Sequence, residues 1–330
     1  MIKDAIYEIL KQPVHVILTI FFIIGVILAF KSIKNQKQRL QNYAEENNDK
    51  LKYQIDYLTN DEELVLERNK RARGNKMFII FSILGFATMF ISLGFGFVIL
   101  ILGFFISLKN SGNYTKVFKS KVIQQKLLEY DSSLIYNPLG EIPESIYYMA
   151  KFEKFDTYIS EDEIQGTIEG NKFILADVCT QEYDKNSETY DTKFRGQVAI
   201  VELPTSLGFN LSIVKNSNEK DIFSKEKRII SDNSNFEDFY DVFSTDDLKT
   251  MKILTPAVTT RILEMSKQHG FDFELKLIDN YIFFRFHAIN LFEPNVNNPA
   301  VEAAKIKLYI EILDSIKSIM HELIEVIKKA

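Results

Sequence analysis

The side chains best suited to chemistry are scattered along this 330-residue sequence. The single cysteine, Cys179, falls within an alternating strand pattern and has no evident histidine partner for nucleophilic catalysis. No HExxH motif or cysteine pair supplies the spacing of a zinc site, and the four histidines lie far apart, at His15, His269, His287 and His321. A core or edge position is the simpler prediction for His287, which lies in an apolar strand pattern.

Glycine and acidic motifs predict turns and helix starts instead of a site. GTIEGNK, at 166–172, has its second glycine one position too early for a phosphate-binding loop and lies between two expected strands, so it predicts a hairpin turn. Carboxylates cluster before the first of these strands, at 161–163, and in STDD at 244–247. Ser, Thr and Asp begin helices by accepting hydrogen bonds from free N–H groups. The sequence therefore predicts no catalytic, cofactor-binding or metal-binding residue, and no cofactor.

Two apolar segments are long enough to enter a membrane. The first, Val14–Phe30, is about 17 residues long, near the lower limit for crossing a hydrocarbon core of roughly 30 Å. Apolar residues before it repeat at helical spacing, so 1–30 is interpreted as an interfacial segment, or a helical extension, followed by a transmembrane helix. The second, Met77–Leu108, carries no charge. As one helix it would be about 48 Å long and would need a tilt of about 50°, beyond the usual range.

Basic residues favour a transmembrane hairpin at 77–108. They follow the first span, precede the second apolar segment and follow it again. Positive flanks stay on the cytoplasmic side, and only a hairpin that turns near Ser92, Gly94 and Gly96 places all three flanks there. The prediction is three spans, with the N-terminus outside and the body in the cytoplasm. A single crossing, which would place the body outside, is the alternative.

Residues 31–76 predict a charged helical arm, because they contain no proline and a single glycine. Apolar side chains fit heptad a and d positions at Ala44, Leu51, Ile55, Leu58 and Val65. Asn48 and Glu62 interrupt this pattern. Thr59 and Glu62 have the spacing of a capping box, so a break is expected at 59–61. Two interpretations stay open, a solvated arm and a coiled coil that dimerises or binds a partner.

The body, residues 109–330, shows the alternation of an antiparallel sheet. From Glu163 the pattern has period two in EIQGTIEG, NKFILADVCT, KFRGQVAIVEL and FNLSIVK, which predicts four strands with a turn at Gly170–Asn171. FDFELKLI and YIFFRFHAI flank Asp279–Asn280 as a second hairpin. About six strands are therefore expected in one antiparallel sheet.

Helical spacing surrounds these strands, at 116–130, in FEDFYDVF at 236–243, and at 256–268. A final helix from about Pro299 has an apolar face too broad for a two-stranded coiled coil, which favours burial against the sheet over docking onto a partner. The predicted fold class is α+β: an antiparallel sheet of about six strands with flanking helices and a long C-terminal helix, anchored by N-terminal transmembrane helices.

Composition excludes some functions. The net charge of −5 and the lack of a basic cluster in the body argue against nucleic-acid binding, which requires clustered Lys and Arg. A lone cysteine cannot form an internal disulfide and fits a reducing compartment. Neither the interrupted arm nor the broad terminal helix determines whether the chain forms a homo-oligomer.

Four stretches stand out in the body: SEDEIQGTIEGNKFILADV (160–178), KFRGQVAIVEL (193–203), FEDFYDVFSTDDLKTMKILTPAVTTRILEM (236–265) and LFEP (291–294). Together they resemble the bacterial membrane-protein family called domain of unknown function 3137, over most of 116–330. LTP followed by an amphipathic helix, a hairpin and FEP is the most specific part. At Lys249–Lys252 this sequence has Thr-Met-Lys where the family usually has Ala-Arg before LTP, so any role of that arginine does not carry over.

The resemblance implies a helical arm and an apolar membrane hairpin ahead of the body, with an envelope-associated partner, and it supplies no activity. The motifs themselves predict that Thr255 caps the helix opened by Pro256, that Phe292 plugs the sheet and that Pro294 stops a strand. Arg261 and Glu293 are the two candidate surface residues for ligand contact.

The function expected from these observations is that of an integral protein of the bacterial inner membrane. Its cytoplasmic domain is expected to be non-enzymatic and to bind a protein partner, which could itself be a membrane-associated protein. The lipid bilayer is the other expected partner of the chain. One alternative is a membrane-surface enzyme or small-ligand binder with an unrecognised site. The other is a structural component of the envelope.

Overall fold

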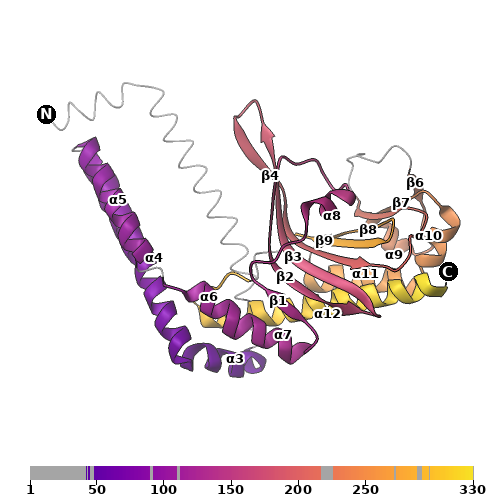
Figure 1. Ribbon diagram of the computed structural model, residues 1–330, viewed down its shortest axis with the longest axis horizontal. Coiled ribbons are helices and arrows are strands. Elements are labelled where there is room, and N and C mark those ends of the chain that lie inside the picture. Colours follow the sequence, from indigo (N-terminus) through magenta and orange to yellow (C-terminus); the bar gives the residue numbers. More distant parts are fainter. Residues whose placement is uncertain are drawn as a thin grey trace.

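The protein folds into a large sheet flanked by helices, with two long helices that extend away from it, as Figure 1 shows. The computed structural model describes residues 42, 44, 48–89, 92–109, 112–216, 226–270, 273–287, 292–296 and 298–329. The first predicted span, 14–30, lies outside the described residues.

The helices and strands have the following bounds. The helices are α3 (Asn48–Asn60), α4 (Glu62–Met89), α5 (Leu93–Lys109), α6 (Tyr114–Phe118), the π-helical turn η1 (Lys119–Ile123), α7 (Gln124–Tyr130), α8 (Glu144–Met149), α9 (Ser234–Glu237), α10 (Asp247–Ile253), α11 (Pro256–His269) and α12 (Pro299–Lys329). The strands are β1 (Ile135–Asn137), β2 (Thr157–Ile168), β3 (Asn171–Asp184), β4 (Thr189–Glu202), β5 (Leu211–Lys215), β6 (Lys227–Ile229), β7 (Tyr240–Ser244), β8 (Phe273–Ile278) and β9 (Tyr281–Phe286).

The nine strands found among the described residues join one antiparallel sheet in the order β1-β2-β3-β4-β9-β8-β5-β7-β6. The α+β class and the long C-terminal helix are therefore confirmed, but the expected six strands were too few. Three-residue strands such as β1 and β6 are too short for periodicity to reveal. The helical prediction for 236–243 was also wrong, since α9 ends at Glu237 and β7 follows. Tyr240 and Val242 are buried there at strand spacing.

Both predicted hairpin turns are present. Ile168 pairs with Asn171, so the first turn consists of Glu169 and Gly170, one residue earlier than expected. Both turn residues have positive φ, 52° and 79°, as a two-residue turn of this kind requires. The second turn lies at Asp279–Asn280 as predicted, with φ of 55° at the aspartate.

The two faces of the sheet are covered by different elements. Along β4, Ala199 and Val201 belong to the core that contains α11 and α12, while Val198 and Ile200 face the core beneath α8. The predicted burial of the terminal helix is confirmed, because its apolar side chains at 306, 312, 313, 316, 319, 320, 323 and 324 are buried. Thr255 caps α11 as expected, since its hydroxyl accepts a hydrogen bond from the Val258 N–H.

The arm bends close to the predicted position, but a different residue caps its second helix. The Asp61 carboxylate accepts a hydrogen bond from the Leu64 N–H at 2.9 Å, whereas the Thr59 hydroxyl donates back to the Ile55 carbonyl. Leu51 and Leu58 are buried, and α3 packs against α12. The apolar stripe of the arm is thus covered by the protein's own body.

Helices α4 and α5 form an antiparallel pair. A Cβ at Gly103 would lie 2.2 Å from the Phe81 Cβ, and one at Gly85 would lie 2.6 Å from the Leu100 side chain, so both glycines allow close approach. α4 continues the arm without a break across residue 77, and the pair projects from the body (Figure 1). Among the described residues one helical stretch, Gly94–Tyr130, contains an apolar window long enough to cross a membrane, and little of that window is buried.

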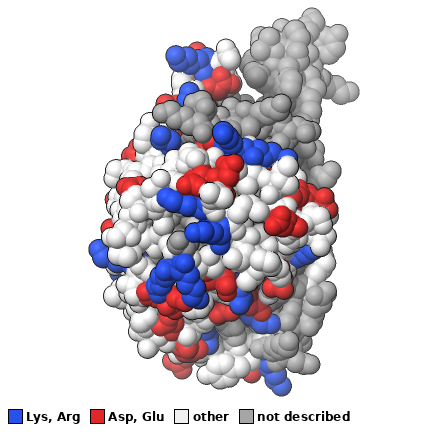
Figure 2. All heavy atoms as spheres, turned by 90° about the vertical axis from the view of Figure 1, so that its right-hand side faces the viewer, with Lys and Arg blue, Asp and Glu red and all other residues white. Residues whose placement is uncertain are grey.

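The end of the body remote from α4 and α5 is formed by β6, β7, α9 and α10 (Figure 1). Figure 2 shows this end with Lys and Arg interspersed with Asp and Glu around uncharged surface. Four large apolar side chains are exposed on these elements and beside them, at Ile230, Phe239, Leu248 and Met251.

Candidate functional site

A cavity of about 390 Å³ lies where α4 meets the body, and it is open to solvent. Its wall combines residues from α4, α6, the segment before α12, and α12 itself. They are Arg71, Asn75, Thr115, Glu293, Pro294, Asn295, Val296 and Lys305. We call this cavity the junction pocket.

Helix geometry and one short connection position the α4 and α6 side of the pocket. Arg71 and Asn75 are four residues apart on α4 and therefore lie on the same helical face. The Asn113 N–H donates to the Glu67 carboxylate at 2.7 Å, which holds the start of α6 against α4. Gly112, with φ of 63°, supports this close approach, because a Cβ there would lie 2.7 Å from the same carboxylate.

The LFEP motif positions the opposite side of the pocket. Phe292 is fully buried, stacked on Tyr136 with ring centroids 5.7 Å apart and edge-on to Tyr309 at 4.7 Å, so its predicted plugging role is confirmed. This anchor places Glu293 in the pocket wall. The prediction for Pro294 was wrong, because β9 ends at Phe286, well before this proline.

An ion-paired network lies behind Glu293. The Lys119 ammonium is 3.1 Å from the Glu293 carboxylate and donates to Asp162 at 2.7 Å, and the Tyr136 hydroxyl donates to Asp162 at 2.5 Å. Burial lowers the pKa of Lys119, but the two carboxylates outweigh it and raise that pKa above its ordinary value. Burial raises the pKa of Asp162 against the opposing effects of Lys119 and Tyr136.

Asp162 also has an unusual backbone. It lies at an irregularity in the β2–β3 register with φ of 59° and no exposed surface. Positive φ in a residue other than glycine stores strain that the surroundings must overcome, here through the Lys119 and Tyr136 contacts. The carboxylates at 161–163 were expected before the first strand, but they lie within β2, which starts at Thr157. The alternating pattern did not reveal this because the bulge interrupts it.

A second buried pair joins α6 to α12. The Tyr114 hydroxyl donates to the Glu302 carboxylate at 2.8 Å, and both residues are buried. Burial raises the pKa of Glu302 to about 7 and lowers the pKa of Lys305 to about 8. The Lys305 ammonium donates to the Glu293 carbonyl oxygen, which ties α12 to the LFEP segment.

Three polar side chains in the pocket wall have no bonding partner in the described part of the chain. Arg71, Asn75 and Thr115 form no hydrogen bond or ion pair there through their side chains. All three can donate hydrogen bonds. With Lys305 beside them, the pocket is suited to binding an anion. Among the residues of its wall, no nucleophile is hydrogen-bonded to a general base as nucleophilic catalysis would require. Across the described residues, no group of three or more His, Cys, Asp or Glu side chains could hold a metal ion.

The structure does not bring the two predicted candidates together. Glu293 lines the junction pocket, whereas Arg261 lies on α11 and is not part of that wall. The Arg261 guanidinium donates to the Ser318 hydroxyl at 2.8 Å and lies 3.5 Å from the Glu322 carboxylate. Both partners belong to α12, so Arg261 connects the two helices.

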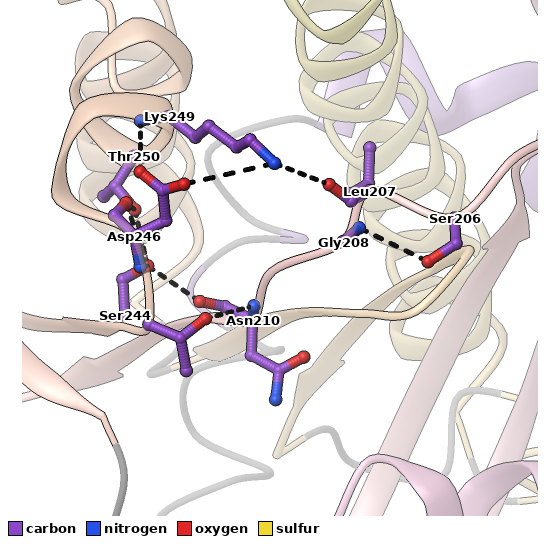
Figure 3. A network of polar contacts seen from close by, with 9 residues as sticks. Ser206, Leu207, Gly208, Asn210, Ser244, Asp246, Lys249 and Thr250 are labelled. Atoms are coloured by element: carbon purple, nitrogen blue, oxygen red, sulfur yellow. Dashed lines mark hydrogen bonds and ion pairs between the residues drawn. The ribbon is translucent and has the colours of Figure 1, made fainter.

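The acidic sequence at 244–247 begins a helix as predicted. The Asp246 carboxylate accepts a hydrogen bond from the Lys249 N–H at 3.0 Å, and Asp247 is the first residue of α10. Figure 3 shows that the Lys249 ammonium also reaches the Leu207 carbonyl, at 3.2 Å, across the loop before β5. These contacts join α10 to that loop and account for the acidic pair without a ligand.

A second buried polar cluster lies on the other face of the sheet, centred on Arg285 of β9. Its guanidinium donates to Glu153, to Glu274 at 2.9 Å and to the Tyr147 hydroxyl at 3.0 Å. It also lies over the Phe152 ring, 4.0 Å from the centroid. We call this the Arg285 cluster.

Sequence reasoning named one residue of the junction pocket, Glu293, and missed the rest of both sites. Arg71 and Lys119 were counted only as parts of basic membrane flanks, and Asp162 only as one of the clustered carboxylates at 161–163. One available signal was the charge of Arg285 inside the apolar run YIFFRF, since a buried charge requires partners. His287 was placed within the same strand, but it follows β9 and is exposed, with its ring 5.0 Å from that of Phe194.

Comparison with known proteins identifies a family for part of the chain and assigns no activity. The model of the family described as "Protein of unknown function (DUF3137)" matches residues 191–324, so the resemblance inferred from sequence is confirmed over that range. No curated protein matches the chain. Among solved structures, the crystal structure of the mycobacterial trehalose monomycolate transport factor A, TtfA, is similar at 8% identity. It covers 59% of this chain and 96% of its own, with a TM-score of 0.32, too low to support an argument.

Proposed function

Because residues 191–324 belong to the DUF3137 family, whose description assigns no activity, we propose a function from the geometry of the molecule. The chain is a membrane-anchored, non-enzymatic module whose body lies on the cytoplasmic side and binds a protein partner. The observation that carries this proposal is the exposed apolar surface of the α4–α5 pair.

Large apolar side chains cover the outside of this pair from residue 78 to residue 108. The exposed ones are Phe78, Ile79, Ile80, Ile83, Leu84, Phe86, Phe95, Phe97, Val98, Ile101, Leu102, Phe104, Phe105 and Leu108. A continuous apolar surface of this kind is unfavourable in water and marks a membrane or protein contact. From Met77 the α4 limb is about 20 Å long and α5 about 26 Å, short for a core of roughly 30 Å but within reach of local thinning.

The antiparallel arrangement also supports the orientation. Arg71 and Lys76 precede the apolar part of α4, and Lys109 and Lys116 follow that of α5, so the basic flanks are at the same end of the pair. Positive flanks remain on the cytoplasmic side of a membrane. The body continues from that end, which supports the proposal that it lies on the cytoplasmic side with them. The span at 14–30 and a bacterial inner membrane remain predictions from sequence.

The remote end of the body supports a protein partner. Leu248 is 80% exposed on α10 and Ile230 is 70% exposed after β6, and both lie away from α4 and α5 (Figure 1). Figure 2 shows charges of both signs at this end of the body. Exposed apolar side chains with a polar rim are typical of protein contacts.

Cysteine labelling tests the topology. In a Cys179→Ser background, Lys185→Cys places an exposed thiol on the β3–β4 turn. We expect a membrane-impermeant maleimide to label it only after cells are permeabilised. Labelling of intact cells would show that the body lies outside, and the proposed orientation would be wrong.

Site-specific photo-crosslinking tests the partner. A photoreactive residue in place of Leu248 is expected to join one defined protein in cells, and Ile230→Asp is expected to abolish that product. Leu139, which is 93% exposed beside β1 at the opposite edge of the sheet, provides the matched control position. The same product from both positions, or from neither, would contradict a partner at the α10 end.

A second candidate function is small-ligand binding at the junction pocket. It is favoured by one observation, the three polar side chains there that have no partner among the described residues.

A further inference from the structure

The junction pocket lies at the depth of lipid headgroups if the α4–α5 pair is in a bilayer. Arg71 and Asn75 precede Met77, where the uncharged segment begins, by about 9 Å and about 3 Å along the helix. The headgroup layer extends roughly 5 to 7 Å from each side of the hydrocarbon core. Asn75 therefore lies within this layer and the Arg71 backbone just beyond its outer edge, from where the long arginine side chain can reach a headgroup. The rest of the pocket wall lies beside them.

The pocket offers the donors that a phosphate group requires. The Arg71 guanidinium presents five N–H donors in a planar fork that binds phosphate oxygens in pairs. The Asn75 amide and the Thr115 hydroxyl add donors from α4 and α6. None of these three side chains has a partner in the described part of the chain, so a ligand would not have to displace an existing contact.

Charge in the pocket also favours an anion. Arg71 and Lys305 contribute two cations to the wall, and Glu293 contributes one carboxylate. That carboxylate is ion-paired with Lys119 at 3.1 Å. Glu293 and the buried Glu302 also interact with the charge of Lys305, so Arg71 is the cation of the wall with no ion-pair partner among the described residues. Lys305 is almost fully buried, where an added anion would interact with it strongly because the surroundings screen charge poorly.

We infer that the junction pocket binds a phosphate group, and that its depth selects the phosphate of a phospholipid headgroup over free phosphate. The volume of about 390 Å³ is sufficient for such a headgroup. The choice of a lipid source rests on the proposed membrane anchoring, whereas the phosphate chemistry rests on the pocket alone.

The test uses the full chain in an uncharged maltoside detergent, with bound lipid measured by native mass spectrometry. Phosphatidylglycerol is titrated against diacylglycerol with the same acyl chains, which lacks only the phosphate-containing headgroup. We expect Arg71→Ala to weaken phosphatidylglycerol binding roughly tenfold or more, the effect of losing a charged hydrogen bond. Arg73→Ala is the matched control. Arg73 is exposed on the same helix and lies outside the pocket wall, so this substitution removes the same charge without changing the pocket.

Several results would overturn the inference. Equal weakening by Arg71→Ala and Arg73→Ala would mean that only net charge attracts the lipid. Equal binding of diacylglycerol would mean that acyl chains, not phosphate, are recognised. If inorganic phosphate or glycerol phosphate binds the wild-type chain as well as phosphatidylglycerol does, the phosphate site stands and the lipid source is wrong. Failure of the anchoring proposal is seen separately, in the cysteine labelling, because binding in detergent does not depend on which side of a membrane the body lies.

Discussion

The junction pocket and the Arg285 cluster both place an arginine among polar side chains, but the two arginines differ in their partners. Arg285 is almost fully buried and contacts two carboxylates, a tyrosine hydroxyl and an aromatic ring. Arg71 is half-buried beside a cavity and has no polar partner among the described residues. The fold supplies partners to both terminal nitrogens of the Arg285 guanidinium, whereas the Arg71 guanidinium has none among the described residues.

This difference separates a structural charge from a binding one. A buried charge must be paired, because leaving it alone in the interior is costly. Once paired, it has little capacity left for a ligand. A cation that the fold leaves unpaired beside an accessible cavity retains that capacity, at little cost because water still reaches it. Substitutions should therefore affect stability at Arg285 and ligand binding at Arg71.

The largest loss of stability is expected from Arg285→Met. It leaves Glu153 and Glu274 without their cation, and breaking a buried ion pair in this way costs about 4 kcal/mol. Urea unfolding of the detergent-solubilised chain, followed by tyrosine fluorescence because the sequence has no tryptophan, measures the change. Arg195→Met, at an exposed position of β4, is the control and should change stability by no more than about 0.5 kcal/mol. Similar losses for both variants would remove the distinction between partnered and exposed arginines.

A smaller loss is expected from Lys119→Met, which leaves the fully buried Asp162 with only Tyr136. We expect about 3 kcal/mol, less than for Arg285, because the Glu293 side chain is 44% exposed and can be rehydrated. The same unfolding measurement applies, with Lys116→Met on the exposed side of α6 as the control. A loss below about 1 kcal/mol would show that the network behind the pocket is not structural.

The smallest effect concerns pH. Burial raises the pKa of Glu302 to about 7, and the surrounding Tyr114, Lys305 and Arg68 oppose that rise. The folded state therefore binds a proton that the unfolded state releases, so stability increases as pH falls from about 7 towards the ordinary carboxyl value of 4.5. Between pH 7.5 and 5.5 the wild type should gain on the order of 2 kcal/mol over Glu302→Gln.

Lys305 does not obscure this measurement. Burial lowers its pKa to about 8, so its contribution increases with pH only above that value and is constant between pH 5.5 and 7.5. Parallel stability profiles for wild type and Glu302→Gln would contradict the raised pKa.

Local chemistry made several features predictable. The Asp279–Asn280 turn, the Thr255 cap and the buried face of α12 each depend on residues close together in the sequence. The bulge at Asp162 was not predictable in this way, because it is stabilised by Lys119 and Tyr136 from other elements. Arg285 shows the same limit, since its partner Glu153 lies 132 residues away.

The sequence by itself determined the elements: an uncharged segment that forms two exposed apolar limbs, an α+β body and a terminal helix with a broad buried face. These follow from hydrophobic periodicity and turn residues, which act over a few positions. Only the tertiary structure decided which polar side chains meet. Arg71, Thr115 and Lys305 form one pocket because α3 packs on α12 and Asn113 holds α6 against α4, and no local pattern encodes contacts over such separations.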